Sequence, residues 1–292
     1  MPGLRDKLSQ LLPDRWYVSL QQLKHDGRLP NLRHPQTFTD KVQWYKLYYR
    51  DPLLTRIADK LEVREYIRQK GFAGLLNDLY GVFDSVDEIP LASLPSSFVL
   101  KATHGSGMNI ICRDKRSVDW PASLARMRGW LDTNFYDLCR EWAYRDIRPR
   151  VLCEKYLENQ DSGELFDYKL YCFDGKPAAI FVCSGRHGPG GVRYSTYDLD
   201  WRRIPVTKGK PTSDLDFAKP ATLPTMCQVA SSLSAGFPFL RVDFYEVDGR
   251  LIVGELTLYP DAGLSPFKPA SYELAFGRLF NLPAQPVGAR QG

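Results

Sequence analysis

The stretch RVDFYEVDGRLIVGELTLYP, residues 241–260, carries the most information about the fold. It reads as two apolar strands joined by a tight turn at Asp248-Gly249, a dipeptide typical of β-hairpins. Each strand contains a carboxylate, Asp243 in the first and Glu255 in the second. Burying a carboxylate among apolar side chains is costly unless its charge is compensated, and a hard cation such as magnesium can do so. The hairpin is therefore predicted to be a metal site, unless both carboxylates lie on a solvated sheet face.

The spacing of these two carboxylates sets a geometric condition. Asp243 and Glu255 are 12 residues apart, so a clean two-residue turn at 248–249 would put them on opposite faces of the hairpin. They share a face only if the turn is odd in length, for instance three residues with Gly249 left-handed at a bulge. A shared metal site therefore requires an irregularity, which we expect near Gly249.

A strand with both charge signs lies upstream of the hairpin. In DYKLYCF, residues 167–173, Asp167 and Lys169 are two residues apart and so point to the same face of a strand. Such a face is either exposed to solvent or lines a polar site. Arg186 follows the next predicted strand and adds a cation beside the glycine-rich loop HGPGG.

A lysine and a glycine loop follow an earlier predicted strand, FVLKA (98–102). Lys101 is near the end of this strand, and the loop contains His104, Gly105, Ser106 and Gly107. Glycines let backbone N–H groups approach phosphate oxygens, and a lysine supplies positive charge for the same phosphates. The spacing matches neither a P-loop nor the dinucleotide-binding fingerprint. A phosphate site and a plain glycine turn between two strands therefore both fit this segment.

The strand-like segment VLCEKYL (151–157) ends in Glu154, Lys155, Tyr156 and Leu157. A charged pair at the end of an apolar strand often marks only a sheet edge. Its position, about one helix and one strand after the glycine loop, makes it a candidate for ligand contact.

Composition restricts the function classes. The 292 residues are 43% hydrophobic and 25% charged, as in a folded globular protein rather than a disordered chain. The formal charge of +5 is too small to indicate nucleic acid, and no zinc-finger, KH or RNP pattern is present, so we expect no nucleic acid partner. The six cysteines form no CxxC pair and mostly lie in apolar runs, which predicts a reducing, cytoplasmic location. No signal peptide or transmembrane segment is expected.

The order of predicted elements is that of an α+β protein. Residues 1–89 are predicted to be mainly helical, with an amphipathic helix over 55–70. Residues 121–147 are predicted to form one long helix. The tail, residues 283–292, is predicted to be disordered.

Taken in order, these segments resemble the ATP-grasp superfamily: a lysine and glycine loop, a helix, an E-K-Y-L hinge, a D-x-K strand and two acidic strands. Within it, the sequence is most similar to the TupA-like ATP-grasp family, named for teichuronopeptide biosynthesis. The matching stretches are ADKLEVREYI, LPSSFVLKATHGSG, EKYLEN, DYKLYCFDGKP and RVDFYEVDGRLIVGELTLYP. The resemblance runs from about residue 36 to 282.

The resemblance implies an ATP-grasp fold in which two α+β lobes clasp ATP. A small lobe, residues 90–155, would cover the phosphates with Lys101 and residues 104–107. A large lobe, residues 156–282, would hold magnesium. Residues 154–157 would form the hinge that contacts adenine and ribose.

The same resemblance assigns roles in the large lobe. Asp167 and Lys169 would reach the triphosphate, and Asp243 and Glu255 would hold magnesium. Thr257 stands where most members have Asn, a better metal ligand, so the number of magnesium ions is left open. The groups expected to stabilise developing negative charge are Lys169, Arg186 and Arg241.

The implied reaction joins a carboxylate acceptor, a small molecule or a saccharide, to an amine such as an amino acid, with cleavage of ATP to ADP and phosphate. Family context suggests a uronic-acid-type carboxylate in cell-surface polysaccharide biosynthesis, with a peripheral contact to membrane-linked polysaccharide machinery. A phosphotransferase on the same fold is one alternative. A glycosyltransferase is another, because Asp214-Leu215-Asp216 formally matches a DxD motif. A catalytically inactive ATP-binding module is disfavoured by Lys101, Asp243 and Glu255.

Overall fold

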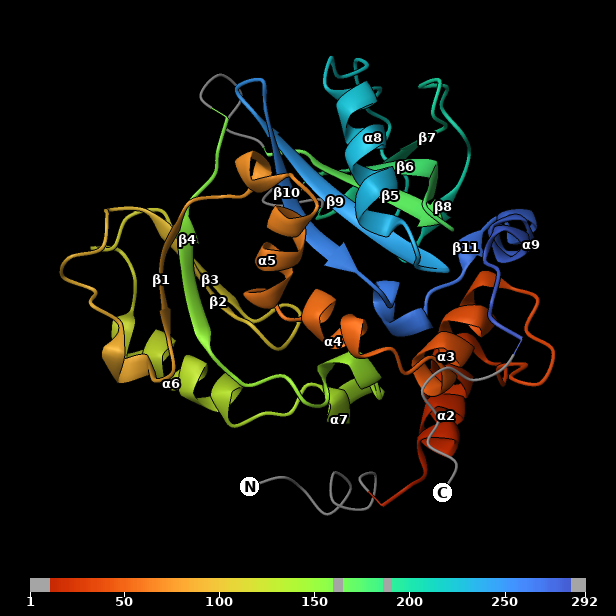
Figure 1. Cartoon of the computed structure of the whole chain (residues 1–292), viewed down its shortest axis with the longest axis horizontal. Helices are drawn as coiled ribbons and strands as arrows, with labels where there is room; N and C mark the ends of the chain where they lie inside the picture. Colours follow the sequence, from red (N-terminus) through yellow and green to blue (C-terminus); the bar gives the residue numbers. More distant parts are fainter. Residues whose placement is uncertain (1–10, 160–164, 186–190, 285–292) are drawn as a thin grey trace.

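The computed structural model describes residues 11–159, 165–185 and 191–284. Within these ranges the chain is a mixed α+β protein built on antiparallel sheets, as predicted. A four-stranded and a five-stranded sheet lie side by side, with two short helices, α4 (Pro52–Ala58) and α5 (Glu62–Gln69), between them (Figure 1). Among the helices of the described residues, none combines the length and the apolar character needed to cross a membrane.

The smaller sheet has the strand order β1 (Leu79–Phe83), β4 (Val151–Lys155), β2 (Phe98–Ala102), β3 (Asn109–Cys112). Its first strand, β1, precedes the expected start of the small lobe at residue 90. The helix α6 (Trp120–Leu131) packs on β2, where the Trp120 ring stacks on Phe98 at 5.9 Å between centroids. The expected lobe boundaries remain a prediction.

The prediction of one long helix over residues 121–147 is wrong. The segment forms α6, the single turn α7 (Tyr136–Cys139) and the 3-10 turn η3 (Trp142–Tyr144). Polar side chains at the break bind the backbone locally: the Thr133 hydroxyl donates to the Gly129 carbonyl at 2.7 Å, and the Asn134 side chain accepts from the Tyr136 N–H at 3.1 Å. Such bonds compete with continuation of a helix.

The larger sheet has the order β10 (Arg250–Thr257), β9 (Phe239–Val247), β5 (Asp167–Phe173), β6 (Lys176–Ser184), β7 (Arg193–Tyr197). One face of β5, β6 and β9 is covered by the helix α8 (Leu223–Ser234). On the other face, Tyr171 and Phe239 pack against Phe38 at 6.1 and 5.1 Å between ring centroids. The same face continues from this aromatic cluster to Lys169 and Asp243, because residues two apart on a strand share a face.

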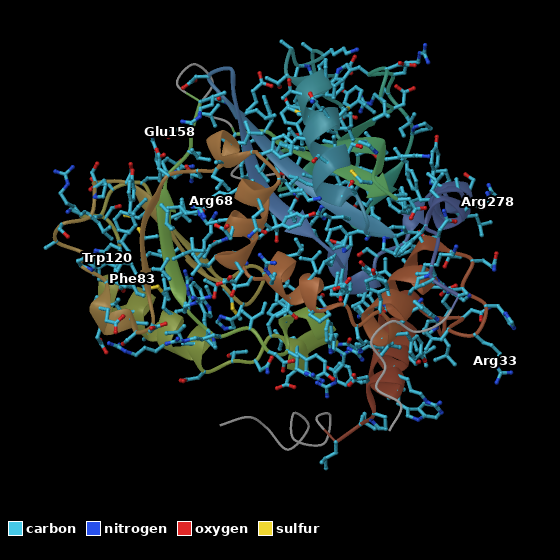
Figure 2. All side chains as sticks on the ribbon, in the orientation of Figure 1. Arg33, Arg68, Phe83, Trp120, Glu158 and Arg278 are labelled. Carbon is cyan, nitrogen blue, oxygen red and sulfur yellow. The ribbon has the colours of Figure 1, made fainter. Side chains whose placement is uncertain are left out.

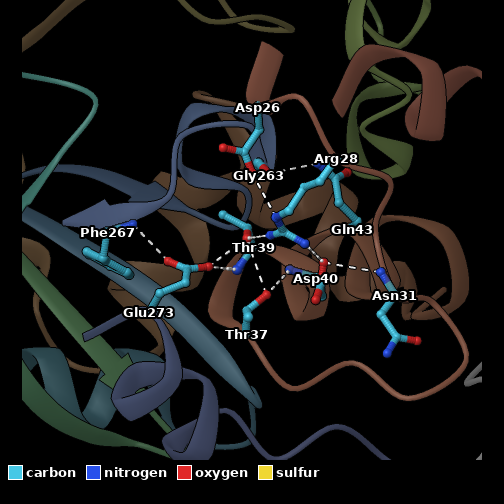
Figure 3. A network of polar contacts seen from close by, with 10 residues as sticks. All are labelled: Asp26, Arg28, Asn31, Thr37, Thr39, Asp40, Gln43, Gly263, Phe267 and Glu273. Atoms are coloured by element: carbon cyan, nitrogen blue, oxygen red, sulfur yellow. Dashed lines mark hydrogen bonds and ion pairs between the residues drawn. The ribbon is translucent and has the colours of Figure 1, made fainter. Parts of the chain in front are cut away.

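The N-terminal region is helical, as predicted: α2 (Asp14–Asp26) and α3 (Phe38–Tyr48) precede α4 and α5. Buried polar contacts fix α3 against α9 (Ala270–Leu279) and the two-stranded sheet of β8 (Thr207–Lys208) and β11 (Phe267–Lys268). The Glu273 carboxylate accepts from both the N–H and the hydroxyl of Thr39 at 2.6 Å and from the Phe267 N–H at 2.8 Å (Figure 3). Arg28 adds an ion pair to Asp40 at 2.7 Å. The expected disordered tail lies mostly outside the described residues.

Candidate active site

The hairpin of β9 and β10 brings its two carboxylates together. Asp243 lies directly opposite Glu255, so both side chains share one face of the sheet. The turn itself is a clean two-residue one, with positive φ at Asp248 (48°) and Gly249 (74°). The irregularity expected near Gly249 was therefore wrongly placed: the extra residue is Gly254, where the register shifts between Val253 and Glu255.

Gly254 is the residue that the local packing tolerates at the bulge. A Cβ atom at this position would lie 2.6 Å from the Tyr245 ring, closer than side-chain atoms approach each other. The close approach of Tyr245 thus requires glycine here, and the bulge in turn sets the register that pairs Asp243 with Glu255.

Asp243 is held by two cations. The Arg241 guanidinium donates to both of its carboxylate oxygens at 2.7 and 2.6 Å, and Lys169 Nζ donates to Oδ2 at 2.7 Å. Lys169 also donates to Asp167 at 2.6 Å, and Arg241 donates to the Thr257 hydroxyl at 2.9 Å. All of these charged groups are buried, so pairing is what makes their burial tolerable.

These ion pairs also fix the protonation states of Lys169 and Asp243. Burial by itself lowers the pKa of Lys169, but Asp167 and Asp243 outweigh it, and the pKa is raised. Burial likewise raises the pKa of Asp243, yet Arg241 and Lys169 outweigh it, and the pKa is lowered. Both groups are therefore charged at neutral pH.

Glu255 differs from its neighbour. Its side chain is half-buried and forms no hydrogen bond or ion pair with any residue that the structure describes. Protein-bound magnesium usually takes one or two carboxylates and completes its shell with phosphate oxygens and water. Glu255 offers a free carboxylate to an ion held in this way, whereas Asp243 is paired with Arg241 and Lys169 behind the cavity wall and would have to give up one of these contacts to join it. The described ranges contain no cluster of three or more metal-binding side chains, so phosphate oxygens and water would supply the remaining ligands.

A cavity of about 300 Å³ opens in front of Glu255, between the two sheets and beside α4 and α5. Glu255 and Lys169 line one side of it, and Asp243 lies behind Lys169. Lys101 and Glu154 of the smaller sheet line the opposite side. The cavity's polar residues are Lys60, Arg64, Lys101, Ser106, Asn109, Glu154, Asp167, Lys169, Tyr245 and Glu255.

Glu154 is the counterion of two of these cations. Its carboxylate accepts from Lys101 Nζ at 2.7 Å and from Arg64 Nη1 at 2.8 Å. Arg64 is further fixed by the Asn77 carbonyl at 2.7 Å. Glu154 thus orients Lys101 toward the cavity, and its expected hinge contact stays a prediction.

The rest of the expected hinge lines a second, smaller cavity. Lys155, Tyr156 and Leu157 surround a slot of about 130 Å³ that shares Lys101, Asn109 and Tyr245 with the main cavity. The apolar side chains of this slot are those of Val99, Ile111, Leu157 and Leu165. A slot with aliphatic and tyrosine side chains in its walls suits a flat aromatic ring.

The glycine loop divides into two parts. Ser106 and Gly107 line the main cavity. His104 does not: it is buried, burial lowers its pKa, and its Nε2 bonds to the Trp130 carbonyl at 2.9 Å. The Gly105 carbonyl accepts a hydrogen bond from Lys60 Nζ. His104 and Gly105 therefore shape the loop, and the two following residues face the cavity.

Lys60 and Arg64 were not singled out from the sequence. Burial lowers the pKa of Lys60, Lys101 lowers it further, and the nearby Glu255 offsets part of the effect. Both residues belong to the stretch ADKLEVREYI, which contributed to the family resemblance. The sequence signal that could have identified these two residues is a pair of cations one helical turn apart in that stretch.

A strained segment follows β10. Asp261, Ala262 and Gly263 have positive φ values of 50°, 55° and 69°, and the first two are not glycine. Buried side chains hold this segment: Gln43 Nε2 donates to the Gly263 carbonyl at 2.8 Å (Figure 3), and Lys46 Nζ donates to the Ala262 carbonyl at 2.8 Å. Strain of this kind concentrates at ligand sites.

The flank of this segment carries further charge. Lys208 Nζ pairs with Asp261 at 2.6 Å. Burial raises the pKa of Glu141, which lies near Lys46, to about 7. Arg186, expected in the same region of the site, lies outside the described residues.

The profile of the TupA-like ATP-grasp family matches residues 40–281, and no functionally curated protein matches the sequence. The solved structures that are similar include D-alanine–D-alanine ligase from Bacillus anthracis, at 18% identity and a TM-score of 0.39. That match covers 70% of this chain and 59% of the ligase, so the chain spans about three fifths of its length.

Two further structures are similar to a comparable degree. N5-carboxyaminoimidazole synthase from Aspergillus clavatus is 11% identical with a TM-score of 0.43, covering 79% of this chain and 53% of the synthase. D-alanine–D-alanine ligase from Helicobacter pylori is 14% identical with a TM-score of 0.42, covering 84% of this chain and 68% of the ligase.

Proposed function

Because the chain belongs to the TupA-like ATP-grasp family, we propose that it is an ATP-dependent ligase that joins a carboxylate to an amine through an acyl phosphate. The observation that carries the proposal is the cavity between the sheets. Lys60 and Lys101 reach it from one side, and Lys169 and Glu255 from the other, with Asp243 bonded to Lys169. Lysines that face a free carboxylate across one cavity suit a triphosphate with magnesium.

Different residues of the site would contact different parts of magnesium–ATP. The slot beside Tyr156 and Leu157 would take the adenine ring, and residues 106–107 would cover the phosphates with their backbone. Glu255 and Asp243 would hold magnesium, which supplies positive charge to the phosphate oxygens. Lys60, Lys101 and Lys169 would balance the remaining charge, so that phosphoryl transfer needs positioning and electrostatic stabilisation more than a protein nucleophile.

The reaction runs in two steps. An oxygen of the acceptor carboxylate forms a bond to the γ-phosphorus, and the bond from that phosphorus to the leaving ADP breaks. The amine nitrogen then bonds to the carbonyl carbon, and the carbon–oxygen bond to phosphate breaks. The departing phosphate takes one proton from the nitrogen, and an amide remains. Arg241 Nη1 forms no hydrogen bond with the described residues, so its two N–H groups would stabilise the oxyanion of the second step.

We place the acceptor beside Arg241 and the strained segment 261–263. The substrates we propose are a uronic-acid-type carboxylate of a cell-surface polysaccharide and an amino acid. The glycosyltransferase reading has less support, because Asp216 of the DxD match accepts a hydrogen bond from the Tyr197 hydroxyl at 2.7 Å and neither aspartate lines the cavity.

The test measures the release of ADP and traps the acyl phosphate with hydroxylamine. The protein is incubated with magnesium, ATP and a panel of uronic acids, with hydroxylamine in place of the amine. Formation of a hydroxamate, absent in Glu255→Gln, supports an acyl phosphate. ADP release that yields a stable phosphorylated acceptor and no hydroxamate would indicate a phosphotransferase. A melting temperature raised by UDP-sugars and not by millimolar magnesium–ATP would refute the proposal.

A further inference from the structure

The helix α2 carries an apolar stripe on its outward face. Trp16, Leu20 and Leu23 follow the i, i+4, i+7 spacing of one helix face, and their exposed fractions are 53%, 50% and 44%. Val18 and Gln22, on the opposite face, are buried and attach the helix to the protein. The helix is thus apolar on the side that faces solvent.

Neither the fold nor the site accounts for this stripe. The helix lies at the outer edge of the molecule, away from both sheets (Figure 1), and ends before residue 40, where the family match begins. It is anchored from its other side, where Tyr17 and Gln21 donate to the Leu138 carbonyl at 3.1 and 2.7 Å. Side chains of this size exposed along one helix face indicate a contact surface.

The stripe is flanked by cations that have no counterion within the described part of the chain. Arg15, Lys24 and Arg33 are exposed and form no ion pair with any residue in the described ranges. Arg15 lies over the Trp16 ring at 5.1 Å, and Arg33 projects from the edge of the molecule (Figure 2). The acidic residues of the helix do not offset them, because Asp26 pairs with Arg28 at 2.8 Å and Asp14 accepts from the Tyr136 hydroxyl at 2.5 Å.

Two of these cations meet at a hollow beside the stripe. A depression of about 370 Å³ is lined by Arg15, Trp16, Ser19, Leu32, Arg33 and Tyr48. Two guanidinium groups next to aromatic rings suit a phosphate group at the boundary between water and an apolar phase.

We infer that this face of α2 docks on a membrane surface with anionic headgroups. Trp16, Leu20 and Leu23 would enter the boundary between headgroups and acyl chains, and Arg15, Lys24 and Arg33 would contact lipid phosphates. Tryptophan and leucine on one side with basic residues at the margin is the pattern of helices that lie in this interface. A second copy of the chain is a poorer occupant, because a symmetric contact would bring the same three cations against each other.

The inference is tested by flotation of the full chain with vesicles. We expect binding to equimolar phosphatidylcholine and phosphatidylglycerol, and little binding to phosphatidylcholine alone. Leu20→Ser with Leu23→Ser should weaken binding by more than about tenfold. The matched control is Leu215→Ser, since Leu215 is 56% exposed and lies in the loop between β8 and α8. This control should bind like the wild type.

The charge component is tested separately. Arg15→Gln, Lys24→Gln and Arg33→Gln together should weaken binding by about a hundredfold and remove most of its salt dependence. An unchanged rise in melting temperature with magnesium–ATP shows that each variant is folded. Failure of the wild type to float with anionic vesicles would overturn the inference, as would an equal loss in Leu215→Ser. If the wild type does not bind vesicles but forms a dimer that dissociates in the variant with Leu20→Ser and Leu23→Ser, this face is instead a contact between two copies of the chain.

Discussion

Asp243 and Glu255 face each other across β9 and β10 because Gly254 adds one residue to β10. With a two-residue turn at 248–249, a regular ladder would send the two side chains to opposite faces of the sheet. A single glycine thus decides whether the chain has an acidic pair at the cavity.

Gly254→Ala should damage the site more than the fold. The new Cβ would be 2.6 Å from the Tyr245 ring, so either the ring or the bulge must move, at a cost of roughly 1–3 kcal/mol. ADP release should fall by at least tenfold. Gly129→Ala is the control, because its Cβ would meet no atom within 4 Å in α6. Chemical denaturation and ADP release measure the two effects, and an active Gly254→Ala would show that the bulge does not set the acidic pair.

Asp243→Asn and Glu255→Gln should both abolish turnover but differ in stability. Asp243 neutralises buried Arg241 and Lys169, so its replacement should cost about 3–5 kcal/mol. Glu255 has no ion pair among the described residues, so its replacement should change the free energy of unfolding by less than about 0.5 kcal/mol. Urea denaturation without nucleotide measures the difference. Equal losses would mean that Glu255 has a partner in the folded protein.

Lys60→Ala should weaken binding of magnesium–ATP without weakening the fold. Burial lowers the pKa of Lys60, so removing the lysine also removes the cost of burying its charge. We expect an ATP affinity at least tenfold lower and an unchanged or higher melting temperature without ATP. Lys210→Ala is the matched control, because this lysine is exposed and lines neither the main cavity nor the slot. Titration calorimetry of both variants distinguishes a phosphate ligand from a lysine that merely fixes the Gly105 carbonyl.

Glu141 should make stability fall as the pH rises toward neutrality. Burial raises its pKa to about 7, whereas an unfolded glutamate titrates near ~4.3. Its contribution is therefore fully present below about pH 4.3 and is lost as the pH rises through about 7. The stability difference between wild type and Glu141→Gln should change by roughly 2–4 kcal/mol between pH 4.5 and 8. Urea denaturation at several pH values gives this difference, and a flat difference would mean that Glu141 is charged throughout.

The sequence predicted the order of the site segments because each is local. Strand ends, a glycine loop and alternating charges are visible within a few residues, and the structure confirms the α+β class and the helical N-terminal region. The position of the bulge could not be read in this way. Both Gly249 and Gly254 suit an irregularity, and the deciding fact is the Tyr245 ring, which comes from the neighbouring strand.

The two cavity cations that the sequence analysis did not identify have a different explanation. Lys60 and Arg64 precede the first strand of the smaller sheet and reach the cavity only because α4 and α5 lie between the sheets. Nothing in their own neighbourhood separates them from solvated helix residues. His104 illustrates the converse, since a histidine in a glycine loop resembles a ligand until its contact with Trp130 is seen.

Gly263→Ala should disturb the acceptor side of the site and leave ATP binding intact. Gly263 has a φ of 69°, and a Cβ there would lie 2.8 Å from Val42 Cγ1 and 3.0 Å from Gln43 Nε2. Gly236→Ala is the matched control, because Gly236 has a φ of 88° and open space around its missing Cβ.

Positive φ alone should cost Gly236→Ala about 1 kcal/mol, and the steric clash should add at least about 1–3 kcal/mol in Gly263→Ala. Because Gln43 and Lys46 hold the strained segment, its displacement should raise KM for the carboxylate acceptor several-fold, while the affinity for magnesium–ATP stays within about twofold of the wild type. Steady-state kinetics in each substrate, with urea denaturation, measure these effects. Equal KM values in the two variants would show that the segment 261–263 does not contact the acceptor, and would place the acceptor elsewhere in the site.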